Sequence, residues 1–264
     1  MKSRAIIVLI CLAMAVSGCS SGKSNSQENS IQKELLSKIE QLQDANGLEI
    51  YEIQKTSTTM KYYKNKEIVE IKELPQEILN VERKIDLEQK DKIQYQIHMV
   101  PENRETGGEE TLLQLKDEVL STYVVDDNKY EKLQEKKGQS LDAETYLSSM
   151  FYLDDMRTAE NYFHFQKEER GRKTLYTAEL NDTEKFVKYL KEKNHNQKDI
   201  EFHEMKLEYV IEDSGITKVN IRMRNTISNE VQNEKADCIS SDNTIVKDIQ
   251  IKTLHHKPEF IEPE

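Results

Sequence analysis

The sequence predicts an α+β fold in which one strongly curved antiparallel sheet of about 8–11 strands, a half-barrel, packs about three helices on its concave side. Most apolar residues recur at every second position, in short segments that polar turns separate. Helical spacing is confined to a few segments. Strands with such alternation have one dry face that must be buried, and so few helices cannot form a separate layer over every strand.

The clearest strands lie near the C-terminus. Met205, Leu207 and Tyr209 alternate with polar residues, and the alternation resumes at Val219 after a turn at 213–215. Two such runs joined by a short turn predict an antiparallel hairpin. The same reasoning predicts strands over 48–59, 79–87, 93–99, 118–125, 129–133, 161–167, 173–180, 236–240 and 244–254.

Three segments are predicted to be helical. Apolar residues recur every three or four positions over 31–46, and Ser30 stands where an N-cap is needed. Asp142 and either Asn181 or Asp182 are expected to cap the other two helices. The segments without a clear pattern are 60–74, the loop 101–110 and the tail from 255, which is expected to be loosely ordered.

The net charge excludes some partners. The chain carries a formal net charge of −11, and residues 1–18 contribute two basic residues and no acidic one, so the rest of the chain carries −13. A surface this acidic repels nucleic acid and anionic lipid head groups. We therefore expect no nucleic-acid partner, and any attachment to a membrane needs another source of affinity.

Catalysis finds little support in the sequence. It contains no zinc-binding His-Glu-x-x-His helix, no Cys-x-x-Cys pair and no phosphate-binding Gly-x-x-x-x-Gly-Lys loop. His203 and Glu204 are adjacent on a predicted strand, so their side chains point to opposite faces and do not act together. We expect a protein that is not an enzyme and has no catalytic residue, no cofactor and no metal site.

The N-terminus has the features of a signal sequence. A basic start precedes an apolar run over 5–16, which is too short to cross a bilayer. Val16-Ser17-Gly18-Cys19 follows, and it resembles the lipobox of bacterial lipoproteins. The resemblance implies cleavage between Gly18 and Cys19 and a diacylglyceryl group on Cys19, of the kind that palmitate labelling detects. It places the chain on the extracytoplasmic face of the cell membrane, held there by its lipid.

The expected organisation has three parts. Residues 1–18 form the lipoprotein signal peptide, and 19–30 form a flexible tether from lipidated Cys19, because 20–30 is polar throughout. Residues 31–264 form a single α+β half-barrel domain. This order of elements is similar to that of the half-barrel lipoproteins of the LolA, LolB and LppX type and of uncharacterised lipoproteins of Gram-positive bacteria.

That resemblance implies a space for acyl chains between the sheet and the helices. Aromatic and thioether side chains suit such a lining, although the same spacing also suits a filled core. The predicted lining residues are Tyr95, Met99, Tyr146, Met150, Phe151, Phe163, Phe165, Phe186, Tyr209 and Met223.

Two functions of different classes remain open. The first is a membrane-anchored binding module for a lipid or other hydrophobic ligand. The second is a surface interaction or scaffold lipoprotein in cell-envelope assembly, sporulation or germination, with an envelope protein as its partner. Frequent Lys, Glu, Asn and Ile are typical of a low-GC Gram-positive host.

Overall fold

The computed structural model describes residues 26–103, 108–127, 129–158, 162–193, 200–231 and 236–263. The predicted lipobox, with Gly18 and Cys19, and residues 20–25 of the predicted tether lie outside the described residues. Within them, twelve strands form one open sheet in which every strand pair is antiparallel. The strands are β1 Gly47–Lys64, β2 Glu67–Glu73, β3 Glu77–Asp86, β4 Gln94–Pro101, β5 Thr111–Lys116, β6 Val119–Asp126, β7 Lys129–Lys137, β8 Phe163–Arg170, β9 Lys173–Leu180, β10 Ile200–Glu212, β11 Gly215–Glu230 and β12 Cys238–Leu254.

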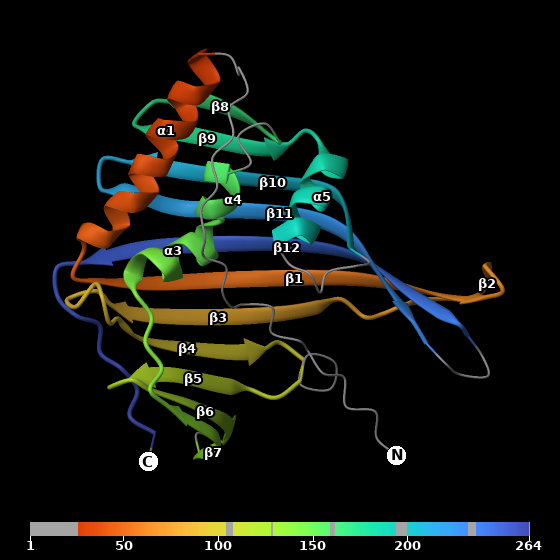
Figure 1. Cartoon of the computed structure of the whole chain (residues 1–264). Helices are drawn as coiled ribbons and strands as arrows, with labels where there is room; N and C mark the ends of the chain where they lie inside the picture. The colour runs from red at the N-terminus through yellow and green to blue at the C-terminus, as the bar shows by residue number, and fades with distance from the viewer. Residues whose placement is uncertain are drawn as a thin grey trace.

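The first and last strands meet in the middle of the sheet. The strand order is β7-β6-β5-β4-β3-β1-β12-β11-β10-β9-β8, with the short β2 paired to the far end of β1. β1 and β12 pair over their whole length, from Gly47 opposite Leu254 to Tyr63 opposite Cys238. Successive hairpins therefore extend the sheet outward in both directions from this central pair (Figure 1).

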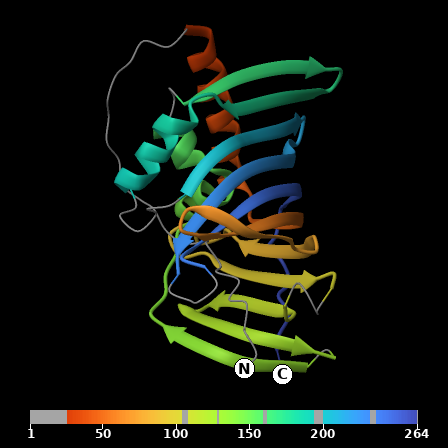
Figure 2. The same cartoon turned by 90° about the vertical axis from the view of Figure 1, so that its right-hand side faces the viewer.

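The four α-helices of the described residues lie on one face of the sheet (Figures 1 and 2). α1 packs on β8 and β11, α5 packs on β10, and α3 and α4 pack on α1. We call the helix-bearing face the inner face. The helices are α1 Ser26–Glu40, α3 Ala143–Phe151, α4 Leu153–Thr158 and α5 Thr183–Lys193, and the 3-10 helix η1, Gln41–Asp44, follows α1.

The period-two pattern decides which side chains the helices cover. On β1, Leu48 and Ile50 face inward and are fully buried, whereas Tyr51 and Ile53 face outward and are each 45% exposed. The main hydrophobic core combines residues of α1, such as Leu35, with inner-face residues of both halves of the sheet. Burial of these apolar side chains is the main force that holds the helices on the sheet.

Two of the three predicted helix starts are confirmed. Asp142 is the N-cap of α3 and accepts hydrogen bonds from the Thr145 backbone N–H at 2.8 Å and hydroxyl at 2.7 Å. Asp182, rather than Asn181, accepts a hydrogen bond from the backbone N–H of Lys185 at 3.0 Å at the start of α5. A side-chain oxygen at this position satisfies one of the otherwise unpaired N–H groups of a helix start.

Other predicted boundaries were wrong. α1 begins at Ser26, so residues 26–30 are helical instead of belonging to the tether, and Ser30 is not an N-cap. The helix that begins at Ala143 is interrupted at Tyr152, which adopts the left-handed conformation with φ 56°, and α4 follows it. The described residues therefore contain four α-helices instead of three, and twelve strands instead of 8–11.

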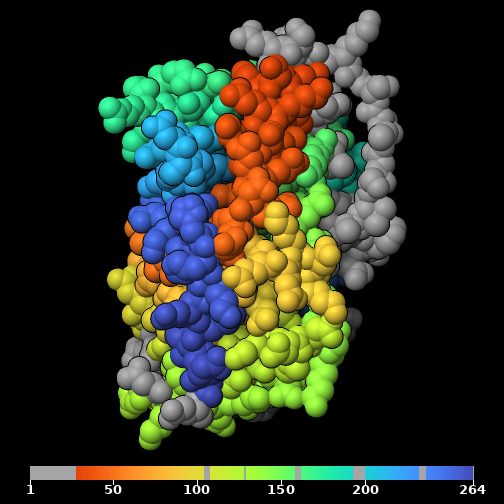
Figure 3. Space-filling model, turned by 90° about the vertical axis from the view of Figure 1, so that its left-hand side faces the viewer, coloured from red at the N-terminus to blue at the C-terminus, as the bar shows by residue number. Residues whose placement is uncertain are grey.

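The C-terminal segment is held in place instead of being loosely ordered. The side chain of Gln96 on β4 donates to the carbonyl of Ile261 at 2.8 Å and accepts from its N–H at 2.9 Å. Lys116 on β5 forms an ion pair with Glu262 at 2.7 Å. Figure 3 shows this segment in dark blue beside the yellow and green residues of β3–β7. It therefore covers part of the outer face that would otherwise be open.

Candidate functional site

An apolar strip runs across the inner face of β4, β5 and β6. Ile97 on β4 lies opposite Leu113 on β5. Met99 on β4 and Val124 on β6 both lie opposite Thr111 on β5, so the three residues form one row across the strands. In the same way, Tyr95 on β4 and Leu120 on β6 both lie opposite Leu115 on β5. We define the inner strip as Ile97, Met99, Leu113, Leu120 and Val124. All five are half-buried, in contrast to the fully buried residues beneath the helices.

The helices cover the inner face unevenly. Their main contacts are with β8, β10 and β11. Toward the inner strip, α3 contributes Tyr146, whose ring centroid lies 5.4 Å from that of Tyr95 on β4. Figure 1 shows no described helix in front of β5, β6 or β7. The inner strip therefore begins where the described helical layer ends.

A buried ion cluster borders this strip. Glu52 on β1 forms ion pairs with Arg83 on β3, at 2.6 Å between Oε2 and Nη2, and with Lys247 on β12, at 2.9 Å between Oε1 and Nζ. The Glu52 side chain is only 2% exposed, and those of Arg83 and Lys247 are 15% and 20% exposed. Arg83 lies directly opposite Ile97 of the inner strip. We call Glu52, Arg83 and Lys247 the ion cluster; its three groups carry a net charge of +1.

The neighbouring charges set the ionisation of the cluster. Burial alone would raise the pKa of Glu52, but the charges of Arg83 and Lys247 and their hydrogen bonds outweigh burial, so the pKa is lowered from its ordinary value. Burial alone would lower the pKa of Lys247, but Glu52 and then Tyr152 outweigh it, so that pKa is raised. All three groups of the cluster are therefore charged at neutral pH.

Sequence reasoning missed the ion cluster, although the sequence contains a signal for it. Each member occupies a position where the strand pattern calls for an apolar residue. Glu52 follows Leu48 and Ile50 in the inward phase of β1, Arg83 lies between Val81 and Ile85, and Lys247 lies between Ile245 and Ile249. A charged residue is rare at a buried position of a strand unless it is paired with an opposite charge. Three such residues in neighbouring strands therefore predict an ion cluster.

The predicted lining residues are mostly gathered in the main core. Tyr209 is an example: it is fully buried, and its hydroxyl donates to the carbonyl of Phe151 at 2.9 Å. Met99 lies in the inner strip, and Tyr146 and Met150 pack against the core from α3. A role for these residues in ligand binding stays a prediction. The buried members are Tyr95, Phe151, Phe163, Phe165, Phe186, Tyr209 and Met223.

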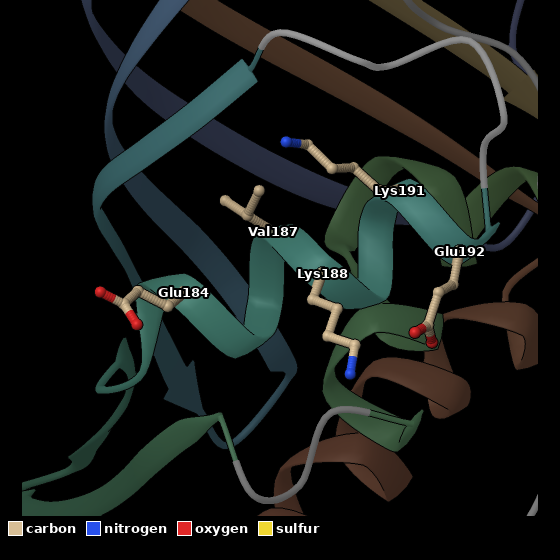
Figure 4. Close-up of a pocket in the computed structure, with 5 residues that line it drawn as sticks. All are labelled: Glu184, Val187, Lys188, Lys191 and Glu192. Carbon is tan, nitrogen blue, oxygen red and sulfur yellow. The ribbon is translucent and has the colours of Figure 1, made fainter.

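A surface hollow of about 550 Å³, whose lining side chains Figure 4 shows, lies along α5, and no residue of the inner strip lines it. Its lining contains two acidic and two basic side chains and a single apolar one, and none of the predicted lining residues. The lining residues are Glu184, Val187, Lys188, Lys191 and Glu192. Such a polar, open surface suits solvent better than an apolar ligand.

His203 and Glu204, adjacent on β10, contact different partners. His203 Nε2 lies 2.7 Å from the hydroxyl of Thr226, while Glu204 forms an ion pair with Arg222 at 2.8 Å. Within the described ranges, no group of three or more His, Cys, Asp and Glu side chains is placed to hold a metal ion. Among the same residues, no helix has both the length and the apolar character needed to cross a membrane.

Comparison with known proteins gives structural neighbours but no family. No family model matches the sequence, and no curated protein matches it. The chain is similar to LprF from Mycobacterium bovis, with 8% identity and a TM-score of 0.38 over 89% of this chain and 97% of that one. It is also similar to a DUF1329 family protein from Desulfovibrio piger, with 9% identity and a TM-score of 0.29 over 87% of this chain and 94% of that one. At these scores neither likeness assigns the chain to a family.

Proposed function

We propose that this chain is a lipid-anchored, extracytoplasmic binding protein for an amphipathic lipid and that it is not an enzyme. The observation that carries the proposal is the contact between the inner strip and the ion cluster, where Arg83 lies directly opposite Ile97. Half-buried apolar side chains suit acyl chains. The charged side chains of the ion cluster beside them suit the polar head group of such a lipid, because charge-assisted hydrogen bonds are the strong ones.

The predicted anchor complements this site. The lipobox resemblance places two ester-linked acyl chains on Cys19, and two chains hold a protein at a membrane where one binds only marginally. Six residues, 20–25, separate Cys19 from the first described helix. A tether this short keeps the inner face near the bilayer from which a lipid ligand would come.

Leu113→Asp tests the binding site directly. We expect it to weaken binding of a fluorescent long-chain fatty acid by about tenfold or more, because it places a carboxylate in the path of the acyl chain; tenfold corresponds to about 1.4 kcal/mol. Fluorescence titration of the full chain in detergent measures the affinity. Ile53→Asp is the matched control, since Ile53 is an apolar residue in the middle of the sheet that faces outward. Equal weakening by both substitutions, or no binding by the parent chain, would contradict the proposal.

The second candidate function, a surface interaction or scaffold lipoprotein, is supported by the outer face. Tyr51, Ile53 and Val246 lie on neighbouring strands there and are 45%, 45% and 39% exposed. Apolar residues gathered on an exposed face are typical of protein contacts. The two functions differ in the face of the sheet where a substitution should impair them. Lipid binding should be lost on substitution of Leu113 on the inner face, and contact with an envelope protein should be lost on substitution of Ile53 on the outer face.

A further inference from the structure

The short strand β2 is the most exposed element of the sheet. It pairs with the far end of β1, and all seven of its residues are exposed. Three of them are apolar: Ile68, Val69 and Ile71 are 51%, 53% and 59% exposed. Figure 1 shows β2 at the end of the long hairpin that it forms with β1, away from the helices.

The outer edge of β2 is available for pairing. In the described part of the chain, β1 is the strand that pairs with β2, so the opposite edge has no partner strand. An edge strand of this kind presents a row of backbone N–H and C=O groups, and proteins usually protect it with a bulge, charges, proline or a covering segment. β2 has a register shift against β1 at Val69 and carries four charged residues. Beyond that shift, Glu70, Ile71 and Lys72 pair regularly with β1 and present an exposed apolar side chain between two opposite charges, which favours the addition of another strand.

The sequence of β2 is complementary to itself in one antiparallel register. A two-fold axis through Ile71, perpendicular to the sheet, places Ile71 opposite its own copy and keeps Glu70 and Lys72 on the same face as their partners, in the part of β2 that pairs regularly with β1. Glu70 then lies opposite Lys72 of the other copy, and this pair occurs twice. Opposite charges directly across two strands stabilise the pairing, and like charges destabilise it.

The neighbouring symmetric registers are unfavourable. An axis through Glu70 places that carboxylate opposite its own copy and Glu67 opposite Glu73. An axis through Lys72 places that ammonium group opposite its own copy. Because like charges face each other in both cases, the register centred on Ile71 is selected.

We propose that β2 is the surface through which two copies of this chain associate, edge to edge, with Ile71 on the two-fold axis. The two sheets then join into one antiparallel sheet, and the outward N–H and C=O groups of the paired residues are satisfied. This association is separate from the inner strip, so it does not depend on the proposed lipid ligand.

Charge exchange tests the register. We expect the full chain in detergent to sediment as a dimer, and Lys72→Glu or Glu70→Lys alone to raise the dimer dissociation constant by about tenfold or more, because each turns two attractive pairs into two repulsive ones. The double variant with Glu70→Lys and Lys72→Glu restores both pairs and is expected to return to nearly the parent value. Both positions are exposed, so the substitutions leave folding intact. A monomeric parent chain, or a double variant no better than the single ones, overturns the proposal.

Disulfide trapping provides a second measurement that does not depend on the affinity. Directly opposite residues in an antiparallel pair have Cα atoms about 4.5–5.5 Å apart, which is within disulfide reach. Ile71→Cys in a Cys238→Ser background is therefore expected to give a covalent dimer on oxidation. Val69→Cys is the matched control, because the two copies of residue 69 are about 13 Å apart along the strands in this register. Equal trapping at both positions contradicts the register.

Discussion

Replacing Glu52 by glutamine is expected to lower the free energy of unfolding by about 3–5 kcal/mol, the usual effect of removing one partner from a buried ion pair. The substitution keeps the shape of the side chain but leaves Arg83 and Lys247 close together without the carboxylate that joins them. Urea unfolding of the full chain in detergent measures the change. A loss below about 1 kcal/mol would show that the ion cluster is not a structural element of the inner face.

Glu49→Gln is the matched control for this experiment. Glu49 lies on the same strand but faces outward, and it forms an ion pair with Lys252 at 2.7 Å. Lys252 is largely exposed, so the expected loss is only about 0–1 kcal/mol. The two substitutions therefore make the same chemical change on opposite faces of β1.

The pH dependence of the Glu52→Gln effect identifies its electrostatic cause. Because the pKa of Glu52 is lowered in the folded chain, its carboxylate stabilises the fold above its ordinary pKa of 4.5, and this contribution declines as the pH falls toward the folded value. The difference in stability between the parent and Glu52→Gln should accordingly shrink below pH 4.5. A difference that stays constant through acid pH would assign the effect to packing instead.

Cys19→Ala is expected to abolish lipidation completely. The thiol is the group that accepts the diacylglyceryl moiety in the lipobox interpretation, and cleavage before residue 19 depends on that modification. We therefore expect a precursor that retains residues 1–18 and incorporates no palmitate analogue in metabolic labelling. Cys238→Ser should leave the label unchanged, because Cys238 lies at the start of β12 and far from the lipobox in sequence. Labelling of Cys19→Ala at the parent level would refute the lipoprotein assignment.

Local sequence patterns predicted the elements that have one covered face. The hairpins β3–β4, β8–β9 and β10–β11 were predicted because their apolar residues alternate and short turns join them. The hairpin β6–β7 was predicted from its turn, although β7 is almost entirely exposed. Asp142 and Asp182 were recognised as helix caps for a similar reason, since capping depends on a few adjacent residues. These features are determined within a short stretch of chain.

Two strands without one-sided burial, β2 and β5, were missed. β2 is exposed on both faces, so it has no alternation to detect. β5 has the opposite character: Leu112 is buried on the outer face with Tyr123 and Val125, whereas the adjacent Leu113 faces the inner strip. Because Leu112 and Leu113 are both apolar and adjacent in sequence, the alternation of apolar and polar residues that indicates a strand cannot be recognised in β5. The C-terminal segment was misjudged because its order depends on Gln96, which is 165 residues away from Ile261.

The candidate site depends on the pairing of strands that are far apart in the sequence, and also on buried charged positions that could have been recognised within each strand. The ion cluster unites β1, β3 and β12, and the pairing of the first strand with the last cannot be deduced from the pattern of either one. The charges in the buried phase of these strands were nevertheless visible in the sequence. The predicted aromatic lining residues do have the right spacing for an inner face, but spacing alone does not separate a filled core from a ligand site.

Native mass spectrometry of the full chain, extracted from its own membrane in mild detergent, tests the central claim most directly. Binding of an amphipathic lipid predicts a mass above that of the lipidated polypeptide. Organic extraction should remove this excess mass, which should correspond to a lipid with a polar head group and acyl chains. The excess should persist in Ile53→Asp and disappear in Leu113→Asp. A chain that shows only the mass of the lipidated polypeptide, even after incubation with a total lipid extract, would contradict lipid binding.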